Sequence, residues 1–402
     1  MSKVIFYILI FQIAVVSVCF GSEKDSIISS NSILYEKVYL HIDRELYSPG
    51  DNIWFKSYLV SGLNNKLIQG YKNIYVQLIS DSGEIILNRL LLSVNGTANG
   101  DFKLNNKIAD GNYKIRAYTK YLENFGDESF FYKNIKIAAA KNSLEIQDNL
   151  TTNTDNIIDV AFLPESGSFV LNAINHIAFK AVNSKGEGIR VSGKIVDEAG
   201  NEVVSFSSKY KGMGKFIMMP QENKSYFALI NEHPDFTYSF KPAVADGICL
   251  NYKPDGKYLQ FTLTRNLKTN TTQNYILRAS HKGIELFSSQ ITMSEFQHAQ
   301  RLYKGLFPLG ISMITLLDNK NNIVAERLVF VQGQKESVIL INSDKEDYKK
   351  REKVKIDISS LLPDNDTIVS NLSVAIVHED YFSSKGITQN MESFLLLDSD
   401  LK

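Results

Sequence analysis

Cysteine is almost missing from this chain of 402 residues, which contains two, and tryptophan occurs only once. Cys19 lies in an apolar run near the N-terminus that we expect to be removed, so Cys249 alone would remain. A single thiol excludes an intrachain disulfide, so the folded chain must rely on well-filled cores. We expect the Cys249 thiol, in the strand-like stretch 246–252, to be buried and inert.

The chain also lacks net charge, because 44 basic residues balance 44 acidic ones and no basic block occurs. This balance provides no field that would steer the chain toward nucleic acid, so we expect no nucleic-acid partner. Proline is scarce, with 8 residues, whereas 20 tyrosines and 23 phenylalanines are present. This composition is typical of a sheet-rich globular protein.

Patterns that bind metals are missing as well. No two of the six histidines have a ligand spacing such as His-X-X-X-His. These histidines are His41, His176, His233, His281, His298 and His378. Asp364-Asn365-Asp366 resembles part of a calcium loop, but no acidic twelfth ligand follows, which favours a simple turn. The sequence therefore predicts no metal site.

Catalytic and cofactor patterns are equally absent from the sequence. Gly212-X-Gly214 lacks the third glycine of a dinucleotide fingerprint and precedes a predicted strand rather than a helix. No Gly-X-Ser-X-Gly elbow occurs, and Cys249 has no obvious histidine partner. We therefore expect no catalytic residue, no cofactor and no enzyme activity.

Residues 1–21 have the pattern of a secretory signal peptide. Lys3 is the charged start, residues 4–20 form the apolar core, and Gly21 is a small residue at the expected cleavage point. We expect export to the periplasm or outer membrane, with no membrane span after cleavage. Lipidation at Cys19 stays an open alternative, although Val18 stands where a small residue should precede a lipidated cysteine.

The stretch 35–60 organises the rest of the sequence. Val38, Leu40 and Ile42 alternate with polar or aromatic residues, as in a half-buried strand. Pro49-Gly50 suits the central positions of a type II turn, because Pro fixes φ and Gly accepts a positive φ. A second apolar run begins at once with Ile53. Two strands joined at such a corner predict the first edge of a β-sandwich.

Residues 43–56 read Asp-Arg-Glu-X-Tyr-X-Pro-Gly-Asp-X-Ile-Trp-Phe-Lys. This motif resembles the opening of the second macroglobulin-type domain in the α2-macroglobulin superfamily. It is most similar to the version in large bacterial envelope proteins, some of which also carry a TonB-receptor plug domain. The resemblance covers nearly all of the mature chain and is strongest in 35–132, 162–229 and 325–331.

The resemblance implies an all-β fold of tandem immunoglobulin-like or macroglobulin-like β-sandwiches. We expect a macroglobulin-like sandwich in 33–140, a second sandwich in 157–245 and a third in 246–333, with a polar connector in 142–156. A fourth sandwich would start in 337–402 and be truncated. Its expected strands include 354–358 and 372–377, and 394–397 would be apolar without a partner strand.

Internal echoes support these divisions. Ile177-Ala178-Phe179-Lys180 repeats the placement of Ile53-Trp54-Phe55-Lys56 after a turn, and residues 211–216 repeat the glycine turn that precedes Phe102. Tyr348 and residues 354–358 repeat the spacing of residues 47–55. Within the first copy, one of Trp54 and Phe55 must face the core, and the other is a packed aromatic or part of a binding patch.

Thioester-bearing members of the superfamily carry a Cys-Gly-Glu-Gln motif, which Cys249-Leu250-Asn251-Tyr252 does not match. Covalent capture of proteases is therefore not expected. The resemblance implies a non-enzymatic, exported scaffold or protein-interaction module of the bacterial envelope, with endopeptidase-inhibitor ancestry and protein partners. Two alternatives are the N-terminal extension of a TonB-dependent outer-membrane transport component, and accessory domains of an enzyme whose catalytic part is absent.

Overall fold

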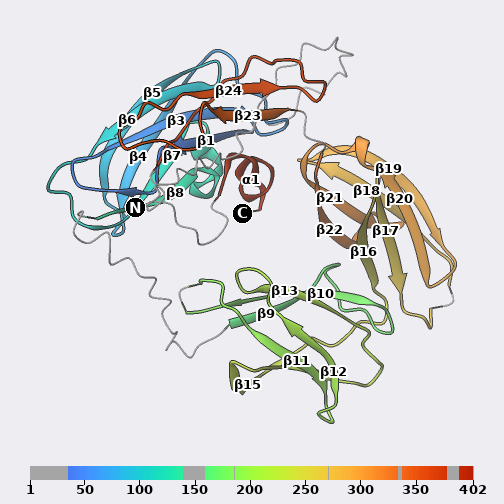
Figure 1. The fold of residues 1–402 in the computed structure, drawn as a ribbon. Coiled ribbons are helices and arrows are strands. Elements are labelled where there is room, and N and C mark those ends of the chain that lie inside the picture. The colour runs from blue at the N-terminus through green and yellow to red at the C-terminus, as the bar shows by residue number, and fades with distance from the viewer. Residues whose placement is uncertain are drawn as a thin grey trace. The chain divides into compact units, whose positions relative to one another are not determined.

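The computed structural model of the chain describes residues 35–138, 159–184, 186–269, 271–333, 337–377 and 389–401 (Figure 1). These residues form mostly antiparallel sheets with little helix, which confirms the predicted all-β class. The chain divides into two compact units, one of residues 1–147 with 332–402 and the other of residues 148–331. The expected signal peptide, the connector 142–156 and His378 lie outside the described residues. No described helix has the length and apolar character needed to cross a membrane.

The first sandwich contains eight strands in the spatial order β1-β3-β6-β5-β4-β7-β8-β2. Their bounds are β1 Glu36–Ile42, β2 Leu46–Tyr47, β3 Asn52–Ser61, β4 Tyr71–Ser80, β5 Ile85–Val94, β6 Thr97–Lys103, β7 Gly111–Tyr118 and β8 Phe131–Ile137. Only Val94 and Thr97 pair β5 with β6, so this hairpin joins two layers. Its turn has φ +48° at Asn95 and +83° at Gly96, which favours these residue types.

The core of this sandwich follows from alternation along its strands. Val38 and Leu40 on β1 and Ile53 and Phe55 on β3 are buried against inward residues of β4, β7 and β8. Successive side chains in a strand point to opposite faces, so Trp54, between Ile53 and Phe55, faces away from these residues. Tyr39, on the other face of β1, is buried as well. Phe55 thus fills the core while Trp54 is on the outer face.

The second and third sandwiches make up the other unit, and each has its own apolar core. The second has sheets β13-β10-β9 and β12-β11-β14-β15. Its strands are β9 Asp159–Pro164, β10 Asn175–Val182, β11 Ser192–Asp197, β12 Glu202–Ser207, β13 Met213–Met218, β14 Tyr226–Ile230 and β15 His233–Ser239. The third has sheets β16-β17-β20 and β19-β18-β21-β22. Its strands are β16 Ile248–Asp255, β17 Tyr258–Arg265, β18 Gln273–His281, β19 Ile284–Met293, β20 Gln297–Tyr303, β21 Gly310–Leu317 and β22 Ile323–Val331.

The first two sandwiches share a packing feature that the sequence echoes did not predict. Phe55 lies opposite Gly100 in the β3–β6 pair, and Phe179 lies opposite Gly214 in the β10–β13 pair. A Cβ atom on either glycine would come within 2.5 Å of the facing phenylalanine ring. Each ring therefore lies across a strand that has no side chain there, and Gly214 provides the space for Phe179.

Residues 337–401 differ from the expected strand pattern. They form the hairpin of β23 (Val338–Ser343) and β24 (Ile356–Leu361), followed by helix α1 (Met391–Leu396). The predicted strand at 372–377 is wrong, because these residues have no strand conformation and pair with no strand in the part of the chain that the structure describes. The apolar run at 394–397 was expected to lack a partner, and most of it is helical instead. The Asn390 side chain accepts the Ser393 N–H at 2.7 Å and caps this helix.

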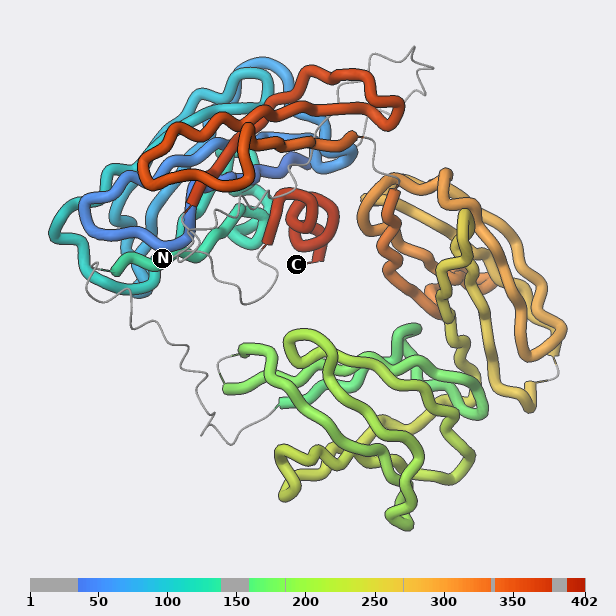
Figure 2. Tube along the Cα trace, viewed as in Figure 1, coloured from blue at the N-terminus to red at the C-terminus, as the bar shows by residue number. Residues whose placement is uncertain are grey.

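Helix α1 packs into the core of the first sandwich, and Figure 2 shows it beside the first strands of that sandwich. The Phe394 ring lies 5.6 Å from that of Tyr39 on β1 and 5.3 Å from that of Phe131 on β8. Lys37 is buried, and its Nζ donates to the Leu395 carbonyl at 2.8 Å and pairs with Asp400 at 2.6 Å. The end of the chain thus supplies both apolar filling and the acceptors that a buried ammonium group needs.

We predict that Phe394→Ala lowers the free energy of unfolding of the first sandwich by about 3 kcal/mol, because truncating a buried ring leaves a cavity. Urea unfolding followed by tryptophan fluorescence measures this directly, since Trp54 is the only tryptophan and belongs to this sandwich. Val369→Ala is the matched control, because Val369 is 99% exposed. Equal effects of the two substitutions would show that α1 does not contribute to the core.

Candidate functional site

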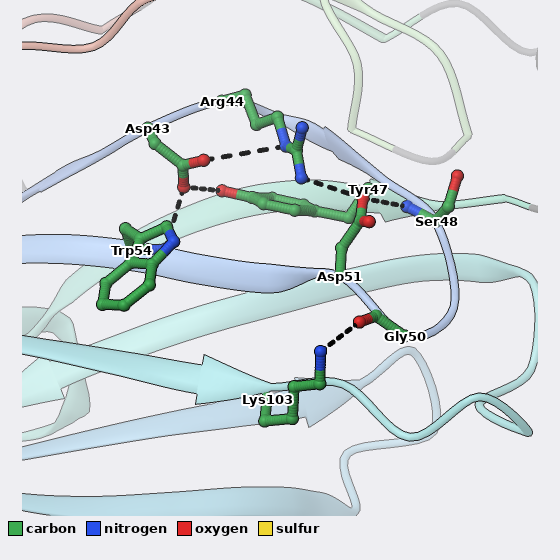
Figure 3. Close-up of polar contacts among 8 residues, drawn as sticks. All are labelled: Asp43, Arg44, Tyr47, Ser48, Gly50, Asp51, Trp54 and Lys103. Carbon is green, nitrogen blue, oxygen red and sulfur yellow. Dashed lines mark hydrogen bonds and ion pairs between the residues drawn. The ribbon is translucent and has the colours of Figure 1, made fainter.

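The family-like motif forms a polar corner between β1 and β3 (Figure 3). The Asp43 carboxylate accepts the Tyr47 hydroxyl at 2.7 Å and the backbone N–H of Trp54 at 2.9 Å. The Asp43 N–H in turn donates to the Trp54 carbonyl at 3.0 Å. Tyr47 is buried, so this acceptor satisfies a hydroxyl that water does not reach. Burial, with the nearby Asp43 charge, also raises the pKa of Tyr47.

Asp51 closes the other side of the corner. Its carboxylate accepts from the Arg44 guanidinium at 2.8 Å and from the Ser48 N–H at 2.9 Å. The Asp51 N–H donates to the Ser48 carbonyl and Gly50 has φ +88°, as the predicted type II turn requires. The polar side chains of the motif therefore bind one another, and the strongest sequence signal marks a structural corner.

A second copy of this corner joins β23 to β24. Tyr348 donates its hydroxyl to Asp344 at 2.6 Å, and the Lys355 N–H donates to the same oxygen at 3.0 Å. The Asp344 N–H donates back to the Lys355 carbonyl. Lys345 and Glu352 pair as Arg44 and Asp51 do in the first copy. The predicted repeat at Tyr348 is confirmed in its hydrogen bonds, although these residues are far more exposed than their counterparts.

Trp54 lies beside an open pocket of about 410 Å³ on the outer face of β1, β3 and β6. Trp54 is 57% exposed while Phe55 is 5% exposed, so the outward aromatic of the pair is the tryptophan. The pocket is lined by His41, Ile42, Asp43, Trp54, Phe55, Lys56, Asn99, Gly100, Asp101, Ser373 and Val374. It combines one large aromatic surface with charges of both signs.

Residues 371–374 form one wall of this pocket. The Ser373 hydroxyl lies 2.7 Å from His41 Nδ1 and accepts the Tyr58 hydroxyl at 2.8 Å. Lys56 donates to the Leu372 carbonyl at 2.9 Å. Burial lowers the pKa of His41, so this imidazole is neutral at pH 7 and suits a hydroxyl partner. Sequence reasoning missed this wall because its residues are distant in the chain from β1 and β3.

The outer face of β4 and β5 presents an unusual apolar patch, which we call the β4–β5 face. Tyr71 lies opposite Val94 in the strand pair, and the next positions on this side of β5 are Leu92 and Leu90. All four side chains are exposed, and Leu92 reaches 59%. The outer face of an antiparallel sheet is normally polar, so a contiguous apolar row is unusual there. The apolar run in β5 was a sequence signal, but its outward direction was not.

A buried polar junction connects the second and third sandwiches. Glu165 at the end of β9 pairs with Arg327 on β22 and with His176 on β10, at 2.5 and 3.5 Å. Burial alone would raise the pKa of Glu165, but hydrogen bonds from His176 and Arg327 lower it to about 2. The Leu250 N–H also donates to the Ser166 hydroxyl at 2.6 Å, so β16 is tied to the second sandwich.

Cys249 lies in this junction, and its predicted burial in a strand is confirmed. Its Sγ donates to Asn175 Oδ1 at 3.3 Å. Burial raises the pKa of the thiol to about 12, so the reactive thiolate is scarce at neutral pH. Cys249 therefore acts as a packed side chain.

The remaining sequence candidates are scattered. His281 is buried, with Nδ1 3.3 Å from the Ser312 hydroxyl, and His233 stacks on Phe236. His298 lies in β20, far along the fold from His176. Asn365 has φ +68° in the tight turn expected for 364–366. Among the residues described, no three potential metal ligands cluster together.

No protein-family model and no curated protein matches this chain. Similar solved structures include native alpha-2-macroglobulin of Escherichia coli, at 10% identity and TM-score 0.23, covering 82% of this chain and 25% of that one. Methylamine-reacted Salmonella alpha-2-macroglobulin is similar at 9% identity and TM-score 0.22, covering 82% of this chain and 25% of that one. Dimeric latent PorU from Porphyromonas gingivalis is similar at 11% identity and TM-score 0.30, covering 74% of this chain and 34% of that one. The chain thus spans between a quarter and about a third of the length of these proteins.

We predict that Asp43→Ala costs about 2 kcal/mol of stability, because it leaves the buried Tyr47 hydroxyl without its acceptor. Urea unfolding with Trp54 fluorescence measures the loss. Asp344→Ala is the matched control and should cost less, since the half-buried Tyr348 can bind water instead. Adding Tyr47→Phe to Asp43→Ala should recover part of the loss. Strictly additive effects would contradict this account of the corner.

We predict that acid opens the junction at Glu165. Because the folded-state pKa is lowered from 4.5 to about 2, this group stabilises the fold above pH 4.5, and the contribution disappears as pH falls toward 2. Labelling of Cys249 by 4,4′-dithiodipyridine, located by peptide mass, should accelerate across this window. Glu165→Gln should label faster at pH 7 and show a weaker acid response. A variant with the wild-type pH profile would exclude Glu165 as the cause.

Proposed function

We propose that this chain is an exported, non-enzymatic scaffold of the bacterial envelope, of the macroglobulin-like kind that its motif resembles. In this proposal the first sandwich binds a protein partner through the β4–β5 face. The observation that carries the proposal is the exposed apolar row of Tyr71, Leu90, Leu92 and Val94 on a sheet face. Exposed rows of this kind are costly in water and mark sites that a partner covers.

The surroundings of this row favour a protein rather than a small ligand. The row belongs to paired strands and is flat, whereas small molecules bind in concave sites. Tyr75, which lies opposite Leu90 in the strand pair, is half-buried and stacks on Tyr118, which in turn stacks on Phe130, with centroids 5.4 and 4.4 Å apart. The last two rings are buried, so this stack anchors the row to the core. The Arg116 guanidinium lies 5.5 Å from the Tyr118 ring. Aromatic and arginine side chains are enriched at the energetic centres of protein interfaces.

The scaffold part of the proposal rests on the buried junction of the other unit. The Glu165–Arg327 pair and the Ser166–Leu250 hydrogen bond fix the second sandwich to the third. Interfaces that contain buried, paired charges have defined geometry, because breaking them leaves an unpaired charge. A rigid pair of sandwiches suits a spacer that positions a binding domain.

We predict that a photo-cross-linking residue at position 92 captures one defined envelope protein in the cells that make this chain. The matched control is position 163, because Leu163 and Leu92 are both 59% exposed and only Leu92 belongs to the row. When the cross-linking residue is placed at position 90 instead, the additional substitution Leu92→Asp should abolish capture, since a charge on the apolar face opposes docking. Cell fractionation of the same samples tests export.

Identical cross-linked species from positions 92 and 163 would contradict a specific interface on the β4–β5 face. Capture of lipid alone would mean that the row faces a membrane surface. Recovery of the chain only in the cytoplasm would contradict the envelope assignment. Each of these outcomes removes a different part of the proposal.

A further inference from the structure

The β23–β24 hairpin reproduces the β1–β3 pair residue for residue. In the first copy, Ile42 pairs with Phe55 next to the corner, and the register runs on to Lys37 and Val60. In the second copy, Ser343 pairs with Ile356 next to the corner, and the register runs on to Val338 and Leu361. The hydrogen bonds of Asp43 and Asp344 are also the same. The first copy is therefore a template for what the second can bind.

In the template, β3 has partners on both edges. On the edge that faces β1, the backbone of Trp54 forms hydrogen bonds with Asp43. On the opposite edge, which faces β6, the Leu59 N–H donates to the Gly96 carbonyl and the Asp51 carbonyl accepts from the Leu104 N–H. Backbone groups alternate in direction along a strand, so Phe55 and Ser57 present theirs to β6. The same alternation makes Ile356 and Ile358 present their N–H and C=O groups to the edge of β24 that faces away from β23.

That edge of β24 is nearly unoccupied among the described residues. β23 and β24 form a sheet of two strands. The contacts on the far edge are a bridge from Leu361 to Thr367, backbone hydrogen bonds from Leu362 to Asp366 and from Ile368 to Ser360, and a hydrogen bond between the Ser370 and Ser360 hydroxyls. The template has the same bridge, from Val60 to Leu67, and it still accepts β6 further along. The bridge therefore leaves the β6 position open in the second copy.

The residues that follow the hairpin are largely apolar, and two of their apolar side chains are exposed. Residues 371–377 read Asn-Leu-Ser-Val-Ala-Ile-Val, close to the Asn-Ile-Tyr-Val-Gln-Leu-Ile of residues 73–79 in β4. In β4 this pattern buries Ile74, Val76 and Leu78. In the second copy, Val374 and Ile376 are exposed. An isolated two-stranded hairpin is marginally stable, and a third strand is what stabilises such a sheet.

We propose that the free edge of β24 accepts an antiparallel strand of a partner polypeptide, in the position that β6 occupies on β3. The template also indicates the residues of that strand. Phe102 lies opposite Ile53, so a large apolar residue belongs opposite Val354. In the first copy, glycine is needed at position 100 because the Phe55 ring fills the space of a side chain there. Ile356 takes the place of Phe55 in the second copy and is smaller, so a β-branched residue fits opposite it. The mode is strand addition, in which backbone bonds provide affinity and alternate side chains provide selectivity.

This inference deepens the proposed interaction role, on which it rests, and it uses a surface separate from the β4–β5 face. The two therefore fail separately. If the chain binds the peptide strand but position 92 captures no partner, the proposed β4–β5 interface is wrong and the acceptor edge of β24 stands. Capture at position 92 without strand binding would remove the acceptor edge alone.

The test uses the full chain and a fluorescein-labelled peptide that copies residues 96–104 with Gly100→Val. We expect a saturable rise in anisotropy with the wild-type chain, and its loss with Ile358→Pro. Proline removes the N–H that faces the free edge, while the bonds from β24 to β23 use the neighbouring residues. Ile358→Val is the matched control and should bind like the wild type. A peptide with proline in place of Ala98 and at position 100 should not bind.

A second measurement covers the case in which Ile358→Pro disturbs the hairpin. Hydrogen exchange on the wild-type chain should show that the peptide slows exchange in β24 and leaves β6 unchanged. Absence of binding, equal binding by Ile358→Pro with a folded hairpin, or protection outside β24 would each overturn the proposal. Loss of binding in Leu92→Asp but not in Ile358→Pro would place the peptide on the β4–β5 face and also overturn it.

Discussion

The hydrogen bonds of one carboxylate determine much of the first sandwich. Asp43 binds the Tyr47 hydroxyl and the Trp54 N–H at once, so it fixes where β1 ends and which residue of β3 lies opposite. A shift of one residue would reverse every side chain on β3. It would turn Trp54 into the core and Phe55 into water, and the ring would no longer lie over Gly100.

The same corner occurs twice in one chain with different surroundings. Around Asp43, Tyr47 is buried and β3 continues into a complete sandwich. Around Asp344, the residues are exposed and β24 keeps an open edge among the described residues. Identical local hydrogen bonding thus accompanies a closed sandwich in one place and a two-stranded sheet in the other. Natural sheets usually protect such edges, so an unprotected one is informative.

Residues near the C-terminus complete the core of the first sandwich, although they are distant from it in the sequence. Phe394 contacts Tyr39 and Phe131, and Lys37 finds its acceptors at Leu395 and Asp400. A lysine at the buried position of β1 would be unfavourable without these acceptors, because an unpaired buried charge is expensive. The helix therefore compensates a charge in the first strand as well as filling an apolar gap.

The sequence by itself determined the all-β class, the type II turn at Pro49-Gly50, the repeat of the corner at Tyr348, and the burial of Cys249. These features depend on local backbone preference and on the alternation of apolar and polar residues, both of which can be read from residues adjacent in the sequence. Tertiary structure alone decided that 394–396 would be helical, that 372–377 would not form a strand, and that Trp54 and Leu92 would face outward. The first two outcomes depend on partners hundreds of residues away, and a six-residue helix has too little intrinsic stability to be predicted without the core that it enters. The direction of Trp54 and Leu92 depends on which face of each strand the core covers, which alternation alone does not determine.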